Sequence, residues 1–102
     1  MLAAIPNVVN LGNITLHNSH TFVVRIQNVG KEIITPAVKV GCTGCTQASL
    51  RDPHIQPGQE TILTIIFTPK AYGNQMKTVR LNYTPKGLNQ QSLVITFNAT
   101  VI

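Results

Sequence analysis

Apolar and polar residues alternate with a period of two along most of the chain, a pattern typical of β-strands that bury one face. The clearest example covers residues 21–27, where Phe22, Val24 and Ile26 fall on one face and Arg25 falls on the other. Comparable alternation predicts strands at residues 34–40, 78–83 and 93–101, with a first strand near 8–16 and a short strand near 47–51. The pattern predicts an all-β protein without helices.

Residues 61–68 form the one run that is apolar on both faces. Such a run is expected of a central strand that is covered on both sides. Together the inward faces predict a core made of Phe22, Val24, Ile26, Val38, Ile65, Phe67, Val79, Leu81, Ile95 and Phe97.

Short segments rich in Gly, Pro and Asn separate the strands, at residues 28–31, 56–59, 69–74 and 85–89. The first of these is read as a tight connection between neighbouring strands, in which Asn28 and Gly30 tolerate a positive φ. About seven strands at this spacing predict an antiparallel sandwich of two sheets. Residues 1–102 are expected to form a single domain with a short N-terminal arm at residues 1–6.

The amino-acid composition narrows the range of possible functions. Charged residues make up 11% of the chain, with only three carboxylates, whereas Thr, Asn, Gln and Ser are abundant. Three carboxylates leave little for paired acid and base chemistry or for a carboxylate metal cage. There is no nucleophile motif and no Gly-rich phosphate loop, and His54 stands alone in a loop. We therefore expect no enzyme activity, no catalytic residues and no cofactor.

The formal net charge of +5 comes from scattered basic residues, which form no run and have no aromatic cluster beside them. This distribution disfavours specific nucleic-acid binding. A diffuse positive field that helps the protein to dock on an acidic protein surface is the simpler interpretation. The apolar stretches are too short to span a membrane, and residues 1–6 do not form a signal peptide.

Several short motifs occur in a characteristic order: residues 11–14 (Leu-Gly-Asn-Ile), 20–22, 28–30, 41–46 (Gly-Cys-Thr-Gly-Cys-Thr), 55–58 and 65–67. In this the chain resembles a bacterial immunoglobulin-like family of unknown function that is related to the ASH, Hydin and major sperm protein domains. The resemblance implies an immunoglobulin-like β-sandwich that acts as a binding or scaffolding module, and it supplies no catalytic residues. The family typically has Cys-Gly-Cys-Thr, so this chain carries one extra residue between its cysteines.

Cys42 and Cys45 are the only cysteines, and His17 and His20 repeat the same spacing. If residues 28–31 join neighbouring strands, Cys42 lies level with His17, and a tetrahedral zinc site with two cysteines and two histidines is chemically possible. Alternatively, both pairs are loop residues, with the thiols either free or joined in a local disulfide, and the two strands part into different sheets. We expect no stoichiometric metal and no thioredoxin-like activity, which requires a helix after the first cysteine.

These observations lead to three functional hypotheses. The first is a non-catalytic structural protein, namely a decoration (auxiliary) protein of a bacteriophage capsid, made in the host cytoplasm and located in the virion, with a major capsid protein as its partner. The second is a bacterial periplasmic or cell-surface scaffolding or adhesion module from which a leader was removed. The third is a small metal- or redox-linked protein that uses Cys42 and Cys45.

For an assembly role, neutral polar strand faces suit lasting contacts because amides and hydroxyls lose water at a lower cost than charges do. The expected contact regions are residues 1–13, 69–74 and 85–91. The apolar arm at residues 1–6 is expected either to anchor the protein in the assembly or to pack on the edge of its own domain. In the first case its deletion should leave the isolated domain folded.

Overall fold

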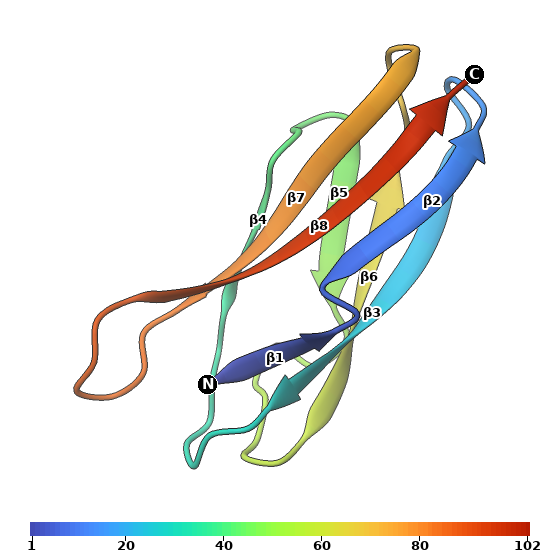
Figure 1. Cartoon of the computed structure of the whole chain (residues 1–102). Helices are drawn as coiled ribbons and strands as arrows, with labels where there is room; N and C mark the ends of the chain where they lie inside the picture. Colours follow the sequence, from blue (N-terminus) through green and yellow to red (C-terminus); the bar gives the residue numbers. More distant parts are fainter.

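The computed structural model describes all residues from 1 to 102 and contains two facing β-sheets of four strands each (Figure 1). Sheet A consists, in spatial order, of β1 (Leu2–Ile5), β3 (His20–Asn28), β6 (Glu60–Phe67) and β5 (Thr46–Leu50). Sheet B consists of β2 (Val8–Ile14), β8 (Gln91–Val101), β7 (Gly73–Tyr83) and β4 (Ala37–Val40). The predicted all-β sandwich is confirmed. The structure contains no helix with the length and hydrophobicity that a membrane crossing requires.

Three features of the strands differ from the prediction. There are eight strands rather than about seven, because β1 was not expected. The sandwich is not wholly antiparallel, since β2 runs parallel to β8. The predicted strand at residues 34–40 is shorter, because only Ala37–Val40 pairs with β7. Before it, Ile34 turns away and forms an isolated bridge with Ile55.

The core lies between the sheets and is centred on aromatic rings. Phe97 in β8 meets Phe22 and Phe67 of sheet A edge-on, with ring centroids 5.2 Å apart in both pairs. Edge-to-face packing of this kind adds to the free energy gained by burying the rings. All the predicted core residues are buried except Phe22 and Val38, which are half-buried and pack against the core from its rim.

The prediction that the central strand β6 is covered on both faces is correct for its inward face and wrong for its outward face. Its inward residues Thr61, Leu63, Ile65 and Phe67 are buried. The alternate positions were expected to be covered as well, yet they are only half-buried, because no further layer packs on the outer face of sheet A. The apolar residues on that face are therefore in contact with solvent.

The segment after β3 is a crossover between the sheets rather than a hairpin turn, which corrects the prediction for residues 28–31. The Asn28 side chain is fully buried and makes three hydrogen bonds to the backbone. Its Nδ2 donates to the carbonyls of Glu32 (2.7 Å) and Ile55 (2.9 Å), and its Oδ1 accepts from the N–H of Gly30 (2.9 Å). Neither Asn28 nor Gly30 has a positive φ. Gly30 is needed for space, because a Cβ there would lie 2.7 Å from the backbone nitrogen of Met1.

Residues 1–6 do not form a free arm. Residues 2–5 pair with β3 as the edge strand of sheet A, and Leu2 is buried. The backbone N–H of Leu2 also donates to the Tyr83 hydroxyl at 3.1 Å, and the N–H of Val29 donates to the Met1 carbonyl at 2.9 Å. Of the two alternatives for this segment, packing on the edge of its own domain is the one observed.

We therefore expect Leu2→Ala to lower the free energy of unfolding by ~2–5 kcal/mol, the usual cost of truncating a buried leucine. Deleting residues 1–6 should destabilise the isolated domain at least as much. Urea unfolding followed by circular dichroism measures both changes. The matched control is Ile5→Ala on the same strand, which is exposed and should change stability by less than about 0.5 kcal/mol. Equal effects of the two substitutions would contradict this register of β1.

Candidate functional surfaces

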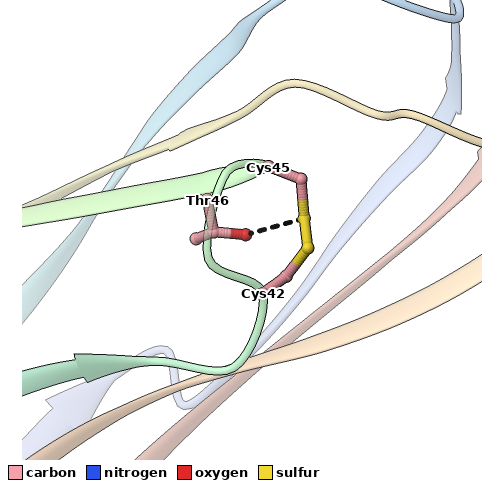
Figure 2. Close-up of a disulfide and its surroundings, with 3 residues drawn as sticks. All are labelled: Cys42, Cys45 and Thr46. Atoms are coloured by element: carbon pink, nitrogen blue, oxygen red, sulfur yellow. Dashed lines mark hydrogen bonds between the residues drawn. A yellow bond between two sulfur atoms is a disulfide. The ribbon is translucent and has the colours of Figure 1, made fainter.

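The loop between β4 and β5 carries both cysteines, and they form a disulfide (Figure 2). The Cα atoms of Cys42 and Cys45 are 5.5 Å apart, within the usual range for a disulfide. The N–H groups of Cys45 and Thr46 both donate to the Cys42 carbonyl, at 3.3 and 3.0 Å. This loop carries the chain from sheet B to sheet A. Because a metal binds the thiolate, the disulfide form offers no cysteine ligand.

His17 and His20 lie at the same end of the sandwich as the disulfide, but not through the predicted pairing. Strands β3 and β4 belong to different sheets, so Cys42 does not lie opposite His17. Instead β6 separates the two regions, with His20 and Thr46 pairing with Phe67 from either side. His17 is exposed, whereas the Nε2 atom of His20 is buried without a hydrogen-bond partner. No three His, Cys, Asp or Glu side chains come together as potential metal ligands.

Two of the three carboxylates are engaged in short-range contacts at the surface. Asp52 accepts hydrogen bonds from the Thr61 hydroxyl (2.9 Å) and the Arg51 guanidinium (3.2 Å), and both lower its pKa. Glu60 accepts a hydrogen bond from Arg25, which lowers the pKa of the Glu60 carboxyl. A carboxyl that acts as a general acid at neutral pH needs a raised pKa, which is the opposite of what these contacts cause. His54, also exposed, lies 2.8 Å from the Thr35 hydroxyl through its Nδ1 and approaches neither carboxylate.

The outer face of sheet A carries an apolar patch, which we define as Ile5, Val23, Ile62 and Ile66. Val23 and Ile5 are 55% and 47% exposed, and the other two are half-buried. The ladders place Val23 between the rows of Ile62 and Ile66, and they place Arg25 between Ile5 and Ile62. Within the patch, Arg25 forms an ion pair with Glu60 at the start of β6. The outer face of sheet A therefore exposes apolar residues on both sides of the Arg25 side chain.

The outer face of sheet B has a different chemistry, because its side chains are mostly amides and hydroxyls. The Ser92 hydroxyl donates to Oδ1 of Asn82 at 2.7 Å, and the Thr100 hydroxyl donates to Oδ1 of Asn74 at 3.0 Å, both between β7 and β8. This face confirms the expectation that abundant Thr and Asn occupy outward strand positions. The two faces therefore offer a partner different contacts.

A cleft of about 290 Å³ opens at the end of the sandwich where the N-terminus lies. It separates residues 31–35 from the loop that follows β7, because β4 pairs with β7 only from Ala37 onward. Figure 1 shows the long β7–β8 hairpin extending past the rest of the molecule on this side. Ile33 and Leu88 expose apolar side chains at the cleft. Sequence reasoning placed a contact region at residues 85–91 but did not anticipate the cleft.

Comparisons with known proteins support the family resemblance. The model of the family described as "Protein of unknown function (DUF1573)" matches residues 3–101. No curated protein sequence matches the chain.

Solved structures share the fold at low sequence identity. The Vibrio cholerae VesB protease matches with a TM-score of 0.80 and 12% identity, over 97% of this chain and 31% of that chain. The ASH/PapD-like domain 7 of human CEP192 matches with a TM-score of 0.78 and 9% identity, over 99% and 84%. SSP-19, an MSP-domain protein-like family member of Caenorhabditis elegans, matches with a TM-score of 0.68 and 15% identity, over 95% and 97%. The chain spans less than a third of VesB, and these likenesses show the fold alone. They confirm that the chain shares its fold with an ASH/PapD-like domain and with an MSP-domain protein-like family member.

The disulfide closes a short loop, and a chain-entropy model gives about 2 kcal/mol of stabilisation for a loop of four residues. We expect the double variant Cys42→Ser, Cys45→Ser to lose about this much in urea unfolding. Mass spectrometry after thiol labelling checks the bond directly. Native protein purified without reductant should resist labelling, and complete labelling of both cysteines would contradict the disulfide.

The Arg25–Glu60 contact predicts a pH dependence. In Arg25→Met the pKa of Glu60 should rise toward its ordinary value, because the hydrogen bond from Arg25 is the largest cause of its lowering. In the unmodified protein the folded-state pKa is depressed, so ionised Glu60 stabilises the fold above its unfolded pKa, and this contribution disappears as the pH falls through the folded value. NMR titration of the carboxyl carbon measures the shift.

Arg51→Met is the matched control for that titration, because Arg51 has the smallest effect on Glu60. It should leave the Glu60 titration nearly unchanged. If Arg25→Met does the same, the Arg25–Glu60 hydrogen bond does not persist in solution.

Proposed function

We propose that this chain, which belongs to the DUF1573 family, is a non-catalytic interaction module that docks on protein partners through the apolar patch of sheet A. The observation that carries the proposal is the pair of chemically different outer faces. Sheet A exposes Ile5, Val23, Ile62 and Ile66 around Arg25, whereas amides and hydroxyls predominate on sheet B. The other exposed side chains of sheet B include the basic pair Lys39 and Arg80 and the separate apolar residues Val8 and Met76. Exposed apolar residues gathered on one face of a sheet are typical of protein-interaction surfaces.

The patch fits the centre of an interface. Val23 and Ile5 each lose contact with water when a partner covers them, which favours association. Arg25 lies among these apolar residues and remains paired with Glu60, and this ion pair would fix the orientation of a partner more than the affinity. The net charge of +5 accelerates the approach to an acidic surface. Charge would thus govern encounter, and the patch would govern the lifetime of the complex.

The assembly that we propose is a bacteriophage capsid, on which the domain acts as a decoration protein made in the host cytoplasm. A decoration protein needs one adhesive face and one face that stays soluble in the finished particle. The apolar side chains of sheet A support the first requirement, and the amides and hydroxyls that predominate on sheet B support the second. The proposal rests on this division of faces and on analogy with the use of lone β-sandwich domains.

A bacterial periplasmic or cell-surface scaffolding module is the second candidate, and the Cys42–Cys45 disulfide favours it. Disulfides persist in oxidising compartments and are rare in the cytosol. Such a module would use the same patch on a different partner. The two candidates therefore differ in location rather than in the surface that binds.

Substitution of the patch tests the docking surface. Val23→Lys should reduce incorporation into purified virions of a phage that encodes this sequence by at least tenfold, because the patch would then have to bury a charge. Quantitative mass spectrometry of virions measures the occupancy. The matched control is Val8→Lys, since Val8 is 52% exposed on the outer face of sheet B. Equal occupancy of both variants would reject the patch, and absence of the unmodified chain from virions would reject the capsid.

A further inference from the structure

The outer face of sheet B contains a hollow of about 300 Å³ where β2, β8 and β7 lie side by side. The strand registers place Asn10, Asn98 and Met76 in one row across its floor. Thr100 and Asn74 form the next row. The hollow lies on a different face from the apolar patch, so it can be tested independently of the proposed docking function.

A bulge in β2 creates the hollow. Asn10 pairs with Asn98 and Asn13 pairs with Thr100, so two residues of β2, Leu11 and Gly12, oppose a single residue of β8. Gly12 has a φ of +72°, and an added Cβ would find nothing within 4 Å. A bulge that bends the strand, together with a position that lacks a side chain, leaves the space open above the sheet.

The lining provides unused hydrogen-bonding groups and no charge. The side-chain amides of Asn10 and Asn98 make no hydrogen bond within the chain, although the two residues are register partners. An amide offers one acceptor and two donors from a planar group. In the next row Thr100 donates to Asn74 at 3.0 Å, which holds that amide in place. Every residue around the hollow is uncharged, so an ionic ligand finds no counter-charge there.

An apolar group completes the site. Met76 is 71% exposed and lies beside Asn98 in the row across the floor. Its flexible thioether can pack against an apolar ligand surface. The ligand must therefore be neutral, rich in groups that both donate and accept hydrogen bonds, and apolar on one side.

We propose that this hollow binds a neutral saccharide. A sugar ring carries adjacent hydroxyls that match the planar amides of Asn10 and Asn98, and its C–H face matches Met76. The volume lies at the small end of ligand pockets, which suits one or two sugar residues rather than a long chain. A peptide would instead add to a sheet edge through its backbone, because the backbone groups beneath the hollow are already paired in the β2–β8–β7 ladder.

The test is NMR titration of the full chain with cellobiose, maltose, lactose and N,N′-diacetylchitobiose. At least one disaccharide should shift the side-chain amides of Asn10 and Asn98 with a dissociation constant in the millimolar range or below, on the order of −4 kcal/mol. A hyaluronan tetrasaccharide, which is anionic, should not shift them. Failure of all four neutral probes to shift these amides, or shifts confined to another surface, would overturn the proposal.

A substitution at Gly12 tests whether the saccharide binds in the hollow or only makes weak contact with the surface. Asn accepts positive φ, and Gly12→Asn meets no atom, so the variant should fold and fill the hollow. We expect it to weaken saccharide binding at least tenfold. The matched control is Gly87→Asn in the β7–β8 hairpin loop, where φ is +77° and the space is equally open. If both variants bind the disaccharide as the unmodified chain does, the hollow is not the site.

Discussion

The crossover from sheet A to sheet B depends on one buried polar side chain, that of Asn28. A buried amide is costly unless its hydrogen bonds are satisfied, and here the crossover itself supplies the partners. The main chain of Asn28 is bound as well: its N–H donates to Gln59, and its carbonyl accepts from Gly58. These contacts join the end of β3 to the turn before β6 and to the segment before β4. The relative placement of the two sheets at this end, including the edge position of β1 beside Val29, follows from this network.

Much of the fold was predictable from local pattern, because each strand buries alternate residues in a single core. Val24, Ile26, Ile65, Phe67, Val79, Leu81, Ile95 and Phe97 lie where their period of two places them. Strand β1 escaped prediction because residues 2–5 are all apolar and show no alternation, and because its pairing depends on the distant edge of β3. The crossover after β3 was misread because an Asn-x-Gly sequence is compatible with a hairpin turn as well as with a buried amide.

The candidate surfaces were predictable to a lesser degree. The composition correctly indicated the polar outer face of sheet B, because abundant Asn and Thr residues in strands are found mostly at outward positions. The apolar patch was hidden because Ile62 and Ile66 looked like residues under a second layer, and only the absence of such a layer exposes them. The hollow depends on a register shift at Leu11 and Gly12. A shift of this kind arises from pairing between segments more than eighty residues apart and leaves no periodic signal.

The parallel pairing of β2 with β8 has a mechanical consequence. The N-terminus and the C-terminus lie at opposite ends of the molecule (Figure 1). Tension applied at these ends pulls β2 and β8 in opposite directions along their common axis. The hydrogen bonds between Val8–Ile14 and residues 96–101 are then loaded together, in shear, rather than opened one after another. Although β1 would detach early, the remaining ladder must break as a unit, so the domain is built to withstand force along the line that joins its ends.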